Sequence, residues 1–133
     1  MKLYLDIDGV LITAKNPNAP EGIDAFLEYV SSNFDCHWLT THCKGDASAC
    51  IQYLKQYLSN NSLVSLSKIK PTTWDTLKTE AIDMEESFYW FDDYPMMAEK
   101  KELEKHGKLD SLIQVNLNNQ NELERIIKIL KNE

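Results

Sequence analysis

Two aspartates near the N-terminus are the first residues whose types and spacing suit catalysis. Asp6 and Asp8 lie two residues apart after the apolar run 3–5, and Gly9 follows them. Glycine adopts turn conformations that other residues reach only with strain, so the segment is typical of a turn that ends a strand. Two carboxylates that leave a strand on the same side can act as general acid and base, or they can bind a cation together. We therefore expect functional carboxylates here.

Polar residues also end two later apolar runs. Thr40 ends the run 36–40 and offers a hydroxyl group to an anion. Asp92 and Asp93 follow four aromatic residues at 88–91. Two adjacent carboxylates at the mouth of a buried strand repel each other unless a cation lies between them or one is protonated. A hard divalent cation is the simplest remedy.

The elements that position these residues follow from the apolar periodicity. Short apolar runs predict strands at 3–5, 36–40, 63–69, 88–91 and 111–115. Between and after them, apolar residues at helical spacing predict helices that begin near Ile23, Asp46, Thr72 or Thr73, Pro95 and Asn121. Five such units predict an α/β fold: a three-layer, Rossmann-like, open parallel five-stranded sheet with helices on both faces. Ligands of such sheets bind beyond the carboxyl ends of the strands, where the polar residues above lie.

Composition limits the classes of protein and partner. The 133 residues, 43% of them apolar, fit a single domain spanning 1–133. No apolar run approaches the roughly 20 residues that span a bilayer, so we expect no membrane partner. A domain of this size needs no disulfide bonds, and three cysteines cannot all pair within one chain, so we expect a reducing, cytoplasmic location. A net charge of −7 argues against indiscriminate binding to nucleic acid, so the sequence gives no strong nucleic-acid signal. A phosphorylated substrate remains compatible, because a metal ion neutralises charge locally.

Three of these segments resemble motifs of the haloacid dehalogenase superfamily of hydrolases. The segment 3–11, Leu-Tyr-Leu-Asp-Ile-Asp-Gly-Val-Leu, is similar to motif I; Trp38-Leu39-Thr40 is similar to motif II, and 90–93, Trp-Phe-Asp-Asp, to motif IV. Motif III of that superfamily is a lysine before the fourth strand. Lys78 fits the short-spaced branch of small members, which includes domains of RNA-repair proteins, and Lys70, in a Lys-Pro pair, is the alternative.

The resemblance implies a Mg²⁺-dependent phosphatase that acts through an aspartyl-phosphate. Asp6 would be the nucleophile and Asp8 the general acid and base, while Thr40 and Lys78 would bind phosphoryl oxygens. Mg²⁺ would be held by the Asp6 carboxylate, the Asp8 main-chain carbonyl, and Asp92 or Asp93. An acid at position 8 favours phosphate-ester hydrolysis over carbon–halogen cleavage.

The connections leave no room for the cap domain that many members of the superfamily insert. By this resemblance, a capless site often suits a macromolecular substrate, such as a phosphoprotein or a nucleic-acid end, or is closed by another subunit. A phosphorylated small molecule stays open as the substrate. Two other functions stay open: a non-catalytic module that binds phosphate or metal, and a phosphotransferase. A phospho-accepting receiver domain fits less well. Its paired acids follow the first strand and its acceptor follows the third, whereas Asp92 and Asp93 follow the fourth predicted strand.

Two further groupings favour structural interpretations. Cysteines and histidines gather at Cys36, His37, His42, Cys43 and Cys50, but without the Cys-x₂-Cys pair of common zinc sites. His42, just after motif II, is the one of these that also suits contact with a substrate. The aromatic residues on the predicted strands indicate core packing rather than base stacking, and Glu99 is interpreted as part of a solvated, charge-balanced helix face.

Overall fold

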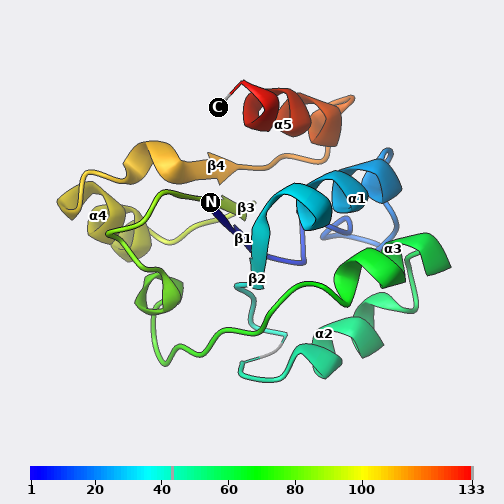
Figure 1. The fold of residues 1–133 in the computed structure, drawn as a ribbon, viewed down its shortest axis with the longest axis horizontal. Coiled ribbons are helices and arrows are strands. Elements are labelled where there is room, and N and C mark those ends of the chain that lie inside the picture. Colours follow the sequence, from blue (N-terminus) through cyan, green and yellow to red (C-terminus); the bar gives the residue numbers. More distant parts are fainter. Residues whose placement is uncertain (43, 133) are drawn as a thin grey trace.

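Four parallel strands form the central sheet of the computed structural model, which describes residues 1–42 and 44–132 (Figure 1). The strands are β1 (Lys2–Leu5), β2 (Asp35–Trp38), β3 (Phe88–Asp92) and β4 (Leu112–Gln114), in the order β2-β1-β3-β4. In the register, Leu5 pairs with Trp38 on one side and with Phe91 on the other. The carboxyl ends of β2, β1 and β3 are therefore level with one another, and the segments that follow these strands meet at one edge of the sheet.

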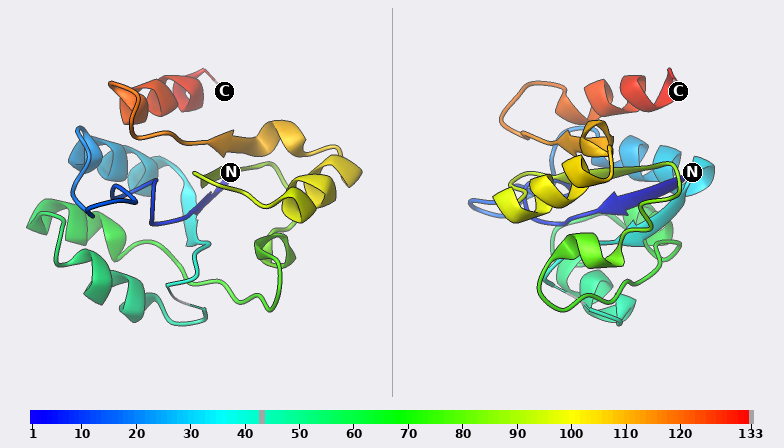
Figure 2. Two further views of the ribbon diagram at one scale, coloured as in Figure 1. Left: turned by 180° about the vertical axis from the view of Figure 1, so that it is seen from behind. Right: turned by 90° about the vertical axis from the view of Figure 1, so that its left-hand side faces the viewer.

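Two apolar layers cover the two faces of the sheet. Leu3 and Leu5 face a core cluster shared with the helices α1 (Ile23–Asn33), α2 (Ala47–Leu54), α3 (Asn60–Leu66) and α5 (Glu122–Lys131). Tyr4 points to the opposite face, where a smaller cluster includes Trp90 and Leu103 and is covered by α4 (Met97–Lys105) and the 3₁₀ turn η1 (Lys78–Ala81) (Figures 1 and 2). This alternation along a strand confirms the three-layer α/β arrangement with helices on both faces.

The prediction of a strand at 63–69, and with it a five-stranded sheet, is wrong. The segment is helical over α3, because the Ser59 side chain accepts a hydrogen bond from the Ser62 backbone N–H and so begins a helix instead of ending one. The predicted strand would have paired with the outer edge of β2. At that edge Lys70 forms a single parallel bridge to His37. Pro71 follows and lacks an N–H, so this edge pairing ends after one residue.

The helix predicted from Thr72 or Thr73 to Ala81 is reduced to the η1 turn. The Glu80 carboxylate accepts hydrogen bonds from the backbone N–H groups of Asp75, Thr76 and Leu77 at 2.8 to 3.1 Å. A side chain that satisfies three consecutive donors stabilises an irregular loop in competition with a helix. A short 3₁₀ helix, η2 (Leu109–Ser111), precedes β4.

The other predicted elements are present with shifted ends. Asp46 caps α2 as expected, accepting a hydrogen bond from the Ser48 N–H at 3.0 Å. Residues 6–22, between β1 and α1, form no helix and no extended strand. Trp38 and Trp90 are fully buried, as core packing requires. No helix within residues 1–42 and 44–132 has both the length and the apolar character needed to cross a membrane.

Candidate functional site

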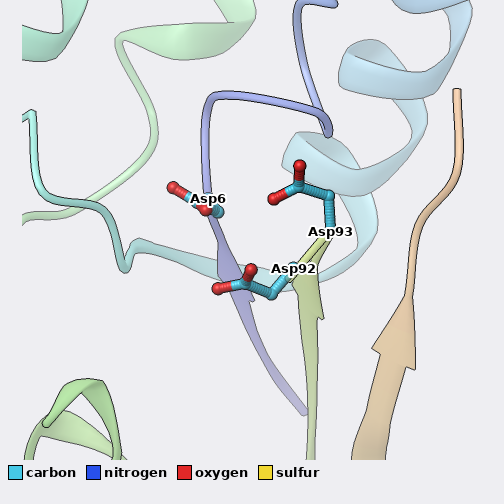
Figure 3. A group of neighbouring side chains, drawn as sticks. All are labelled: Asp6, Asp92 and Asp93. Atoms are coloured by element: carbon cyan, nitrogen blue, oxygen red, sulfur yellow. The ribbon is translucent and has the colours of Figure 1, made fainter. Parts of the chain in front are cut away.

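Three aspartates gather at the carboxyl ends of β1 and β3. Asp6 follows the last residue of β1, Asp92 ends β3, and Asp93 comes next (Figure 3). One carboxylate oxygen from each lies within 4.8 Å of the others. The backbone N–H of Asp6 donates to the Phe91 carbonyl at 3.1 Å, so the sheet itself fixes the distance between the two strand ends.

Lys78 is the cation of this cluster. Its Nζ lies 3.1 Å from Asp6 Oδ2 and 2.8 Å from Asp92 Oδ2. The three side chains are only 13%, 11% and 2% exposed, respectively, so the ion pairs are shielded from water. The remaining oxygens are also engaged: Asp6 Oδ1 accepts from the Ile7 N–H at 2.8 Å, and Asp92 Oδ1 accepts from the Tyr94 N–H at 2.9 Å.

One ammonium group does not neutralise three carboxylates. Burial, together with the charge of Asp92, raises the pKa of Asp6 to about 6, although Lys78 opposes this shift. Burial and the charge of Asp92 also raise the pKa of Asp93. Burial lowers the pKa of Lys78, but the charges of Asp6 and Asp92 more than offset that effect, and the net pKa is raised. Lys78 is therefore a fixed positive charge, and repulsion remains among the acids.

Glu99 holds Lys78 in place, which the sequence interpretation missed. Glu99 is 2% exposed, not solvated; its Oε2 accepts from the Lys78 backbone N–H and its Oε1 from the Met96 N–H, both at 2.9 Å. The sequence signal was a glutamate three residues after the start of a helix, which is the usual position for capping. Its second partner is a tertiary contact that no local pattern indicates.

Asp8 has a different partner from Asp6, although the two were expected to project together. Asp8 Oδ2 lies 2.8 Å from Nε2 of His42, in the loop after β2. The backbone N–H of His42 donates to the hydroxyl oxygen of the fully buried Thr40 at 3.2 Å. The strand ends at Leu5, so side-chain alternation stops before Asp8. Thr40, His42 and Asp8 thus form a second polar chain beside the acidic cluster.

Gly9 allows Asp93 to approach the turn after β1. Its φ is +77°, and a Cβ atom at this position would lie 2.1 Å from Asp93 Oδ2. Both the backbone conformation and the space require glycine. The glycine predicted from the turn therefore has a second role, which is to admit a carboxylate.

The alternative lysine and the alternative metal set do not join this cluster. Lys70 is largely exposed and pairs with Asp35 at 2.9 Å, at the beginning of β2. Cys36 is a free thiol in the core, and burial raises its pKa to about 12. Cys43 lies outside the described residues. In the part of the chain that the structure describes, the three aspartates form the only group of three or more side chains placed to ligate a metal ion.

A polar cleft of about 370 Å³ adjoins the acids. Its lining includes Gly9 and Lys15 from the loop after β1, Asp93 after β3, and Gln114 and Asn116 at and after the end of β4. The Gln114 amide donates to the Asp93 carbonyl at 3.1 Å. Next to the cluster there is therefore room for a group that forms hydrogen bonds.

The donor set of the cluster fits a hard divalent cation. All its atoms are carboxylate oxygens, the ligands that Mg²⁺ prefers, and no sulfur or imidazole takes part. Asp6, Asp92 and Asp93 with Lys78 carry a formal charge of −2 when all are ionised, which one divalent cation neutralises. No protein-family model, no curated protein and no solved structure gives a significant match to this chain.

Proposed function

We propose that this chain is a Mg²⁺-dependent phosphate monoester hydrolase that acts through an aspartyl-phosphate on Asp6. The observation that carries the proposal is the contact of Lys78 with both Asp6 and Asp92, inside a cluster of acids at the strand ends. This arrangement combines a fixed carboxylate, a fixed positive charge and a set of oxygen ligands, which phosphoryl transfer requires.

In the first half of the reaction, Asp6 is the nucleophile. Hydrogen bonds from the Ile7 N–H and from Lys78 hold its carboxylate, and one of its oxygens attacks phosphorus. As that bond forms, the bond from phosphorus to the ester oxygen breaks, and Asp8 gives its proton to the departing oxygen. Asp8 is suited to this step because it lies outside the Lys78 ion pairs and is half-exposed beside the cleft.

In the second half, Asp8 takes a proton from water. The water oxygen attacks the phosphorus of the aspartyl-phosphate, the bond to Asp6 breaks, and inorganic phosphate leaves. Lys78 neutralises phosphoryl oxygens throughout. The Thr40 oxygen already accepts a hydrogen bond from His42, so its O–H is the part that donates to a phosphoryl oxygen.

Mg²⁺ would be held by Asp6, Asp92 and Asp93, with the Asp8 carbonyl as a further ligand, and would stabilise charge on the transferring group. Asp93 is the stronger candidate of the two β3 acids, because both Asp92 oxygens already accept hydrogen bonds. The polar cleft would receive the rest of the substrate, whether a small molecule or the end of a macromolecule.

The test is phosphate release from an aryl phosphate, with and without Mg²⁺. We compare the wild type with Asp6→Asn and Asp8→Asn, and with Asp110→Asn, an exposed aspartate in η2 at the opposite end of the sheet. We expect Mg²⁺-dependent release that both site variants lose and the control retains.

Other outcomes favour the other functions. If the folded wild type binds Mg²⁺, as followed by thermal stability, but releases no phosphate from a panel of phosphate esters, the chain is a binding module. If an added alcohol receives the phosphoryl group in preference to water, the chain is a phosphotransferase.

A further inference from the structure

The Asp8 side chain contacts a histidine whose ring and backbone are each held by another residue. His42 Nε2 lies 2.8 Å from Asp8 Oδ2. The imidazole ring stacks on Tyr53 of α2, with ring centroids 4.1 Å apart and planes 19° apart. The His42 backbone donates to the buried Thr40 hydroxyl. Ring orientation and backbone position are therefore both fixed by other elements.

The fixed ring matters because, among residues 1–42 and 44–132, His42 is the one hydrogen-bond or ion-pair partner of the Asp8 side chain. Its side chain is 45% exposed, and it leaves the chain in a turn, after the end of β1. A free carboxylate of this kind samples several rotamers, and proton transfer requires one of them. When Nε2 carries the ring proton, His42 donates to Oδ2; this hydrogen bond selects one rotamer and leaves Oδ1 as the oxygen that carries the transferred proton.

We propose that His42 is a positioning residue for Asp8, aligning its carboxyl group with the leaving oxygen of the substrate. This inference rests on the proposed phosphatase function. Tyr53 supports the ring, so α2 contributes to the site without contacting the acids. The role depends on geometry and needs no change of protonation in His42.

The role predicts a dependence on the leaving group. A nitrophenolate leaves without protonation, whereas an alkoxide is a strong base and needs the acid in position. The ratio kcat/KM covers only the steps up to departure of the leaving group, so it isolates this effect. Removal of an orienting partner typically costs about 10- to 100-fold.

The experiment measures kcat/KM of the Mg²⁺-loaded protein for p-nitrophenyl phosphate and for an alkyl phosphate. His42→Phe retains an aromatic ring to stack on Tyr53 and loses the hydrogen bond; His42→Gln retains a donor. His106→Phe, at the exposed end of α4, is the matched control. We expect His42→Phe to lose about 10- to 100-fold with the alkyl ester and at most a few-fold with the aryl ester. His42→Gln should recover part of the loss.

A second variant pair separates positioning from a general structural role. In an Asp8→Asn background, His42→Phe should cause no further loss, because the group it positions is gone. An equal loss with both esters, or a full additional loss in the Asp8→Asn background, overturns the positioning role while the phosphatase function stands. A wild type inactive with both esters means that the phosphatase function itself has failed, and the positioning role with it.

Discussion

The buried lysine of the acidic cluster gives the sharpest test of the electrostatic argument. We consider Lys78→Met, which keeps the length of the side chain and removes its charge. Asp6 and Asp92 would then be buried without a counter-ion, and loss of one partner of a buried ion pair costs about 3–5 kcal/mol. Lys70→Met is the control, since its pair with Asp35 is largely exposed and should be worth at most about 1 kcal/mol.

The assay is urea unfolding in EDTA at pH 7.5 and at pH 5. Raising the folded-state pKa of a carboxyl group means that the folded protein binds more protons than the unfolded chain between about pH 4 and 6, so stability falls as pH rises through that window. Without Lys78, which lowers the pKa of Asp6, the window extends upward. The penalty of Lys78→Met should therefore be smaller at pH 5. Equal, small penalties for the two lysine variants would refute the argument.

Three other outcomes follow from packing and burial. Gly9→Ala should abolish the stabilisation by Mg²⁺, because its Cβ would displace Asp93, whereas Gly22→Ala, with φ +81° and nothing nearby, should cost only about 1–2 kcal/mol of unfolding free energy. Glu122→Gln should lower the free energy of unfolding by about 1–3 kcal/mol at pH 7. Hydrogen bonding to Arg125 lowers the pKa of Glu122 in the folded protein, so this stabilisation is present above the pKa of the unfolded chain and is lost as pH falls through the folded-state pKa. Unfolding at pH 3 and at pH 7 measures the difference. The Cys36 thiol, buried and with its pKa raised to about 12, should resist alkylation until the chain unfolds, as peptide mapping would reveal.

The sequence predicted the strand-end acids because each depends on local pattern. An apolar run of strand length followed by acid defines the end of β1 and of β3, and parallel strands bring those ends to one edge. That edge joins Asp6 to Asp92 in the structure. The same reasoning located Thr40 after β2, where its hydroxyl oxygen accepts a hydrogen bond from the His42 backbone N–H.

The errors arose where side chains compete with the backbone. Ser59 caps α3, where a stop was expected, and Glu80 satisfies three loop N–H groups where a helix was expected. Such contacts depend on which of several local hydrogen bonds forms, and composition does not decide this. Glu99 was misjudged for a different reason, because the Lys78 backbone N–H that it binds is far away in sequence. The contact of His42 with Asp8 is also distant in sequence, so no local pattern indicates it.

The adjacent acids raised a question that the structure answers in part. From the sequence, a buried Asp92-Asp93 pair required a cation or a proton. The structure adds a fixed lysine, but Lys78 contacts Asp6 and Asp92, and the pKa of Asp93 and that of Asp6 remain raised. Complete neutralisation by protein groups would have removed the reason to bind a metal ion. The residual repulsion is therefore the driving force that the proposed Mg²⁺ site would use, and the fall in wild-type stability between pH 5 and pH 7.5 in EDTA measures its size.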